Sequence, residues 1–353
     1  MNSDLIVITI MAFLSFILPA LIYNYKVGRS SRFSNEISTF FPLCIAVAPL
    51  SVAAYFIFYD SHDFLRVFWL PEIVALFVAA IALFLSIRNN RLFYLFTIIG
   101  AIAGSWLLPY ATAVAIFPFS AICNRLIVAL LWCLFTYIYK YSDTGDGMTA
   151  IQSLTISLGI AVLGLINAIP VLLGVLGLIF SAAFSALLLF TWPPARLRIN
   201  DKEASCLGFM LFGLMVWTAG ENAGSCVIIY SMYILADFVW ALMLRLTFLE
   251  KYSNIMQNTS YRQSLSIGFS PSSAATFACR GQILLLFFGT FQALSSTQGS
   301  LLLISAFIAV WILYKLRNLS ESLKIRDINR QVVDDLQARV NEVKQYLHRD
   351  DNF

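Results

Sequence analysis

The sequence predicts an all-α polytopic membrane protein with about eleven transmembrane helices. Of its 353 residues, 60% are hydrophobic and only 12% are charged, and the mean hydropathy is +0.81. A soluble domain carries about twice that charged fraction. Apolar runs close to the roughly 20 residues that a helix needs to cross the hydrocarbon core recur from one end of the chain to the other. We therefore expect no sizeable soluble domain between the spans, and no nucleic acid among the partners.

Each span is placed on one apolar run of the sequence. The run over 149–191 is too long for one helix, so a break is expected in the sequence INAIP at 166–170. The first run follows MNSD, with neither a basic segment before it nor a cleavage site after it, which favours a retained helix over a signal peptide. The expected spans are 4–24, 39–59, 69–88, 92–109, 121–140, 149–168, 169–191, 205–219, 223–245, 279–296 and 299–317.

The basic residues predict the orientation of these spans. Only Arg66 and Arg125, two of the 23 lysines and arginines, fall on the side opposite the C-terminus. Because cytoplasmic loops carry the excess of basic residues, we expect the N-terminus outside and the C-terminus in the cytoplasm.

The last part of the chain differs from the rest, so residues 1–318 are expected to form the membrane domain and 319–353 a cytoplasmic amphipathic helix. Its apolar residues recur every three to five positions with charges between them, which approximates a heptad. Such a helix suits a homodimer or the membrane surface, and a solvated extension without a partner is an equal alternative. These apolar residues are Leu319, Leu323, Ile328, Val332, Leu336, Val340, Val343 and Leu347.

Three acidic residues in predicted cytoplasmic loops are candidate ligands for a divalent cation. Asp143 and Asp146 lie in SDTGDG, and Asp201 lies two loops later. Phosphoryl chemistry at a membrane needs a cation held by carboxylates, with phosphate oxygens completing the coordination shell. If the sixth span begins near Ser142, Asp143 and Asp146 share one face of its first turn, where the helix dipole favours an anion. The alternative is a plain polar turn.

One acidic residue falls inside a predicted span. Asp237 lies about midway along 223–245. An ionisable group at this depth is typical of a transporter, and the alternative is a hydrogen bond in helix packing.

Over residues 5–318 the loops resemble, in order, those of the polyprenyl-phosphate N-acetylhexosamine-1-phosphate transferases. YIYKYSDTGDGM resembles the family pattern N-x-x-N-x-x-D-G-x-D-G-L, and NDKEASCLG resembles G-D-x-G-S-L-x-L-G. YILADFVWALMLRL places Asp237 on the aspartate of a P-I-L-D segment, and SLSIGFSPSSA resembles L-x-x-L-G-L-S. The chain departs at the Asp-Asp pair of the family, which falls on Asn89-Asn90, and at its histidine cluster, which falls on TSYR at 259–262.

The resemblance implies an enzyme of the bacterial inner membrane that moves a sugar-1-phosphate from a UDP-N-acetylhexosamine to a polyprenyl phosphate at the cytoplasmic face. It implies Mg²⁺ or Mn²⁺ at Asp201, with Asp143 and Asp146 assisting, and Asn89 and Asn90 orienting the lipid phosphate. The basic residues implied to balance diphosphate charge are Lys140, Arg196, Arg198, Lys202 and Arg262. The alternative function is a catalytically impaired relative that acts as a membrane scaffold or regulator, because asparagine cannot act as a base.

Overall fold

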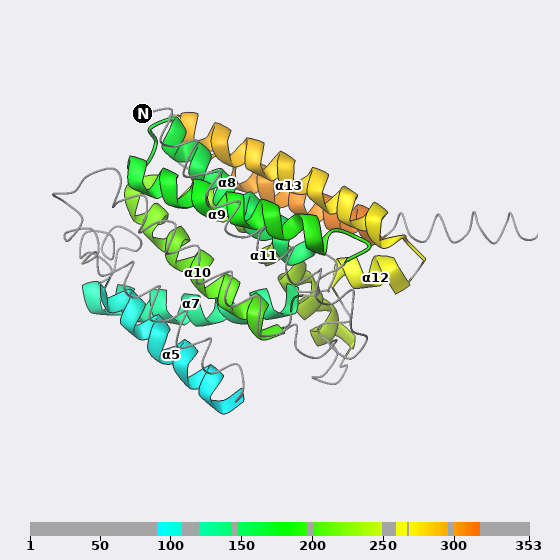
Figure 1. The fold of residues 1–353 in the computed structure, drawn as a ribbon, viewed down its shortest axis with the longest axis horizontal. Coiled ribbons are helices and arrows are strands. Elements are labelled where there is room, and N and C mark those ends of the chain that lie inside the picture. The colour runs from blue at the N-terminus through cyan, green and yellow to red at the C-terminus, as the bar shows by residue number, and fades with distance from the viewer. Residues whose placement is uncertain are drawn as a thin grey trace, which may run out of the picture.

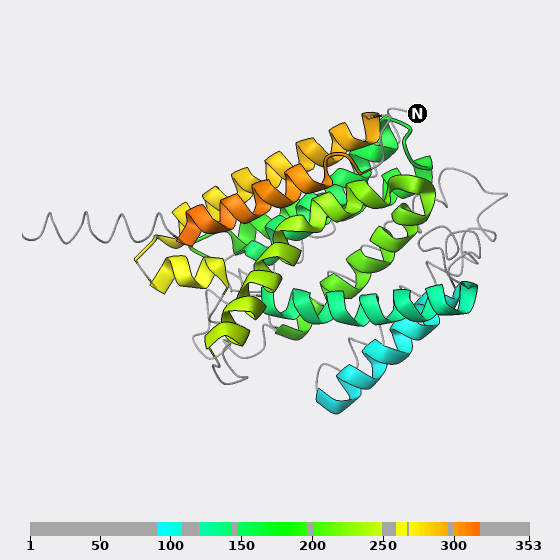
Figure 2. The ribbon, with the colours of Figure 1, turned by 180° about the vertical axis from the view of Figure 1, so that it is seen from behind.

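The computed structural model describes residues 90–107, 120–142, 147–195, 199, 201–248, 259–266, 268–295 and 299–317. These residues form helices and their connections, with no strand among them, so the expected all-α class is confirmed for this part of the chain. The helices lie alongside one another as a bundle (Figures 1 and 2). The predicted spans 4–24, 39–59 and 69–88 and the tail 319–353 lie outside the described residues, so the count of eleven spans stays a prediction.

Five stretches of the described chain are long and apolar enough to cross a membrane. They are Ala121–Tyr141, Met148–Leu165, Leu173–Thr191, Ala204–Leu244 and Pro271–Leu294. The helices are α5 (Asn90–Leu107), α7 (Ala121–Ser142), α8 (Met148–Leu165), α9 (Val171–Thr191), α10 (Asp201–Thr218), the π-helix η2 (Ala219–Ala223), α11 (Gly224–Phe248), α12 (Ser260–Ser266), α13 (Pro271–Leu294) and a last helix over 302–317.

The 41-residue stretch Ala204–Leu244 is a helical hairpin rather than one rod. A straight helix of that length would measure about 60 Å, twice the hydrocarbon thickness. The helical dihedral angles break at Glu221 (φ −87°, ψ 30°) and Asn222 (φ 61°). From there α11 runs back toward the end of the bundle where α10 begins, diverging from α10 on the way (Figure 2). The two helices match the predicted segments 205–219 and 223–245.

The break expected in INAIP is present between α8 and α9. Helix α8 ends at Leu165, Asn167 takes φ 58°, and α9 begins after Pro170. The two helices then pack closely through small residues, because a Cβ added to Gly164 would lie 2.3 Å from the Cα of Gly174. Close backbone approach through glycine is typical of helix pairs in membranes.

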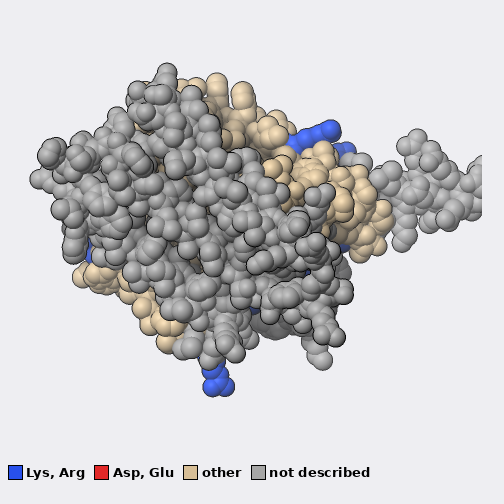
Figure 3. Space-filling model, in the orientation of Figure 1, with Lys and Arg blue, Asp and Glu red and all other residues tan. Residues whose placement is uncertain are grey.

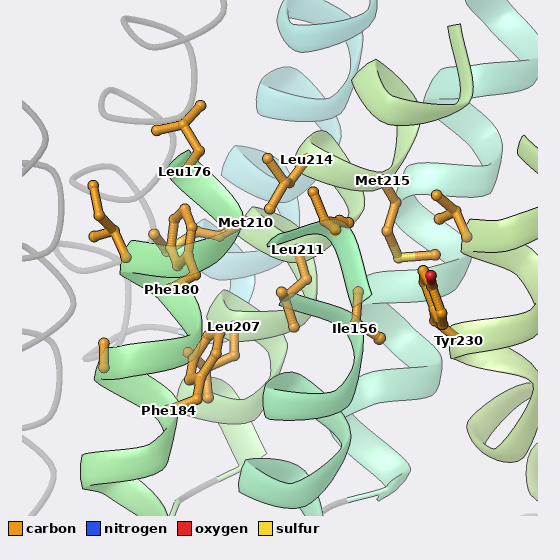
Figure 4. Packing of buried hydrophobic residues seen from close by; sticks show 14 of the residues in the cluster. Ile156, Leu176, Phe180, Phe184, Leu207, Met210, Leu211, Leu214, Met215 and Tyr230 are labelled. Carbon is orange, nitrogen blue, oxygen red and sulfur yellow. The ribbon is translucent and has the colours of Figure 1, made fainter. Parts of the chain in front are cut away.

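The largest apolar cluster lies where α9 and α10 meet α7, α8 and α11. Phe184 of α9 lies beside Leu207 of α10, and Phe180 lies beside Met210 (Figure 4). On the other side of α10, the indole N–H of Trp132 donates to the Phe209 carbonyl at 2.9 Å, which anchors α7. These contacts hold the two helices that carry Lys140 and Asp201 in a fixed relation.

Helix α8 begins at Met148, after Gly147 in the left-handed region (φ 79°), close to the expected span start at 149. The condition of a start near Ser142 is therefore not met, and Asp143 and Asp146 precede the helix instead of sharing a face of its first turn. Helix α13 begins at Pro271 rather than at residue 279, because Ser270 caps it by accepting from the N–H of Ser273. The preceding short helix, α12, was not expected from the apolar pattern.

The flanks of the bundle are apolar. Side chains such as Ile98, Leu130, Phe287 and Phe307 are exposed along α5, α7, α13 and 302–317. In the face shown in Figure 3, the described surface is largely neutral, with Lys and Arg atoms only near its margins. An apolar flank of this kind fits a protein embedded in a membrane.

Candidate functional site

One end of the bundle gathers the helix ends that carry the predicted site residues. We call it the Asp201 end, and it lies at the right of Figure 1, where α12 is labelled. There the end of α7 contacts the start of α5 through Lys140 and Tyr94. The start of α8 meets the end of α9, because a Cβ added to Gly147 would lie 2.9 Å from the Thr191 carbonyl oxygen. Loops far apart in the sequence therefore meet at this end.

Lys140 is held by tyrosines at the end of α7. Its Nζ donates to the Tyr94 hydroxyl at 3.1 Å and lies 5.7 Å from the ring centroids of both Tyr94 and Tyr141. The Tyr141 hydroxyl donates to the Tyr137 hydroxyl at 2.6 Å. Tyrosine rings and a lysine at the end of an apolar helix are typical of the membrane–water interface. Lys140 is thus placed where a phosphate at the membrane surface could reach it.

Asp201 is the first residue of α10 and is half-buried. Its carboxylate is close enough to the Tyr141 hydroxyl to interact with it electrostatically, and its carbonyl accepts from the Ser205 hydroxyl at 2.9 Å. Since Tyr141 follows Lys140 directly, the predicted metal ligand and the predicted phosphate-binding lysine belong to one neighbourhood.

Asp237 is buried, with 8% of its surface exposed, and is the centre of a hydrogen-bonded network. Its Oδ1 accepts from the Ser260 N–H at 3.0 Å and from the Ser260 hydroxyl at 2.6 Å. The Ser260 oxygen in turn accepts from Nε of Arg317 at 3.0 Å. The Arg317 guanidinium lies 5.1 Å from the Trp240 ring centroid, a cation–π distance. The hydrogen-bond interpretation of Asp237 therefore holds, with α12 as the partner.

A small pocket lies between this network and the tyrosines. Its volume is about 10 Å³, enough for roughly one water molecule. Tyr141 of α7, Asp237 of α11 and Thr259 before α12 bring polar groups to it. The residues that complete the wall are Ile138, Ile234, Phe238 and Ala241. Thr259 and Asp237 thus line one pocket, although 22 positions separate them. Thr259 belongs to the segment that the resemblance aligns with the family histidines, and Asp237 aligns with the aspartate of P-I-L-D.

The structure brings together part of the predicted site. Lys140, Asp201 and the half-buried Arg262 of α12 all lie at the Asp201 end. Asn90 begins α5 and Lys202 lies in the first turn of α10, with neither side chain described. The remaining predicted site residues lie outside the described residues: Asn89, Asp143, Asp146, Arg196 and Arg198.

The site also contains residues that sequence reasoning missed. Ser260 and Arg317 contact each other across 57 positions, and nothing in a single sequence predicts such a pair. The sequence did contain a signal for Tyr94, Tyr137 and Tyr141, because aromatic residues near the ends of apolar helices are typical of the membrane interface.

The described residues contain no group of three or more His, Cys, Asp and Glu side chains that could hold a metal ion. Of the three predicted carboxylate ligands, only Asp201 lies among the described residues, half-buried at the start of α10. Mg²⁺ is commonly bound through one or two carboxylates together with substrate phosphate oxygens, so Asp201 could serve as one such ligand. No family model matches the sequence, and the comparison with curated proteins found no match.

Proposed function

We propose that this protein is a membrane transferase that moves an N-acetylhexosamine-1-phosphate from a UDP-sugar to a polyprenyl phosphate. The observation that carries the proposal is the convergence at the Asp201 end. Lys140, Asp201 and the pocket lined by Tyr141, Asp237 and Thr259 come from loops that the resemblance assigns to one active site. The cytoplasmic placement of this end and a bacterial inner-membrane location are parts of the same proposal.

Each residue has a role set by its chemistry. Mg²⁺ bound at Asp201, with Asp143 and Asp146 assisting, would supply charge stabilisation to the diphosphate. Lys140, seated on tyrosine rings, donates to a phosphate oxygen as a point charge. Arg262 offers a planar, bidentate contact. Arg196, Arg198 and Lys202 balance further charge, and Asn89 and Asn90 orient the lipid phosphate. Since that phosphate is largely ionised near neutral pH, positioning accounts for most of the rate enhancement.

One observation favours the alternative, a catalytically impaired relative that acts as a scaffold. The 259–262 segment, where the family has histidines, uses Ser260 to fasten α12 to Asp237 and Arg317. In that arrangement the segment has a structural task of its own. The tail over 319–353 would then be the interaction element, and a homodimer through it is the form we propose.

A radiolabel exchange assay on the purified protein separates the two. With polyprenyl phosphate, Mg²⁺ and labelled UDP-N-acetylhexosamine, we expect exchange that Asp201→Asn abolishes. Glu221→Gln is the matched control, because Glu221 lies at the opposite end of α10 and its loss should leave exchange unchanged. Absence of turnover with several UDP-hexosamines, alongside retained nucleotide binding, would support the scaffold instead.

A further inference from the structure

Among the buried side-chain polar atoms without a hydrogen-bond partner within the described structure, three come from facing helices of the bundle. They are Oε1 of Gln152 on α8, the hydroxyl of Tyr233 on α11 and Nε2 of Gln282 on α13. All three side chains are almost fully buried, at 4%, 1% and 1% exposed. A buried polar group without a partner costs the free energy of desolvating it, so native proteins almost always satisfy such groups with protein or ordered water.

Swapping the amide atoms does not remove the problem. Oε1 of Gln282 accepts from the Thr155 hydroxyl at 2.8 Å. If the oxygen and nitrogen of this amide were exchanged, the oxygen would become the atom without a partner. One polar atom of Gln282 is left over in either assignment.

The packing of Tyr230 places these groups at one level of the bundle. Its ring lies between α8 and α13, because a Cβ on Gly159 would lie 2.5 Å from one ring edge and a Cβ on Gly289 2.3 Å from the other. Seven residues, or about 10 Å of helix, lead from each of these positions toward the Asp201 end. Gly159 leads to Gln152 on α8, Tyr230 to Asp237 on α11, and Gly289 to Gln282 on α13. These three residues therefore lie level with one another.

Tyr233 lies one helical turn, about 6 Å, from Asp237 on the same face of α11, between the level of Asp237 and that of Tyr230. It packs among residues of α8, α13 and 302–317, in the cluster that includes Ile151, Ala278 and Leu313. The leftover donor and acceptor groups are thus a carboxamide oxygen, a phenol and a carboxamide nitrogen from three facing helices.

We propose that the bundle holds ordered water at this level, bonded to Gln152, Tyr233 and Gln282 between α8, α11 and α13. Water is the smallest molecule that both donates and accepts, which matches a mixed set of two amide atoms and a phenol. A separate pocket of about one water in volume lies beside Asp237, and none of the three side chains lines it. The proposal does not depend on the transferase activity.

Radiolytic hydroxyl-radical footprinting on the full-length protein in detergent tests it, because radicals form from water next to the side chain they oxidise. Tyr139 is the matched control: it is 0% exposed, and its hydroxyl is bonded to Ser153 at 2.6 Å. With rates normalised to the unfolded protein, we expect Tyr233 to be oxidised several-fold faster than Tyr139. Equal, low oxidation of the two tyrosines would overturn the proposal.

Substitutions give a second, independent measurement. Tyr233→Phe should lower the thermal midpoint by a few degrees, because it removes hydrogen bonds to the water. In a dry site the same change would be neutral or stabilising, which would overturn the proposal. Gln152→Leu should reduce oxidation of Tyr233, whereas Ser157→Ala should not, since the Ser157 hydroxyl bonds within its own helix at 2.8 Å. Unchanged oxidation in Gln152→Leu would contradict a shared water.

Discussion

Gly177 of α9 is a position where one added methyl group should damage the helix packing, because it faces the backbone of α8. A Cβ there would lie 2.6 Å from the backbone nitrogen of Ala161 and 2.9 Å from the carbonyl oxygen of Ser157, both on α8. Ordinary contacts between such atoms begin near 3.5 Å, so α8 and α9 would have to separate by about 1 Å. Backbone atoms cannot rotate away as a flexible side chain can. We expect Gly177→Ala to lower the free energy of unfolding by about 1–3 kcal/mol.

Gly224→Ala is the control for the intrinsic effect of the substitution. Gly224 begins α11, and the nearest atom to an added Cβ is Cβ of Ala219 at 3.6 Å, an ordinary contact. This change should be neutral or raise the stability by up to about 1 kcal/mol, because alanine favours helix over glycine. The measurement is the free energy of unfolding by SDS titration in mixed micelles. If Gly177→Ala were as stable as Gly224→Ala, the close packing of α8 on α9 would be refuted.

Two further predictions concern the buried network and the orientation of the bundle. In Ser260→Ala, Asp237 loses a hydroxyl donor and Arg317 loses one acceptor, so we expect the free energy of unfolding to fall by about 1.5–3 kcal/mol in the same SDS titration. A double-mutant cycle with Asp237→Asn should show coupling of about 0.5–3 kcal/mol, and additive effects would contradict the network. Single cysteines placed at the exposed Ser266 and Asn222 of a cysteine-free protein should react with a membrane-impermeant maleimide from the cytoplasmic and outer sides respectively. Labelling of both from one side would contradict the hairpin arrangement.

The helices were largely predictable because their apolar runs are long. The break at INAIP followed from length alone, since no single span accommodates 149–191, and the structure places it between Leu165 and Val171. The start of α13 was missed because its first turns contain serine and threonine, which lower the local hydropathy. A serine directly before Pro271 is a helix-start signal that hydropathy does not register.

The site was predictable in its composition but not in its contacts. Lys140 and Asp201 were expected on the same side, because the distribution of basic residues sorts the loops. The position of Tyr141 next to both of them depends on how α7 packs on α10. Contacts such as the hydrogen bond from Trp132 to Phe209 decide that packing. Arg317 could not be assigned to Asp237 from the sequence, because the pair is joined only when the last helix returns to α12.

The network around Ser260 bears on both proposed functions. A buried carboxylate that accepts two hydrogen bonds, with an arginine bonded to the same hydroxyl, is expensive to disrupt, because removing one member takes a hydrogen-bond partner from the others. The network therefore fixes α12, and with it the backbone of Arg262, two residues after Ser260. If the protein is a transferase, this positions a phosphate-binding arginine where the family has histidines. If it is a scaffold, the same network only holds the bundle end together. Arg262→Ala tests the first case: the half-buried Arg262 is outside the network, so its loss should weaken exchange without lowering stability if this arginine binds the phosphate.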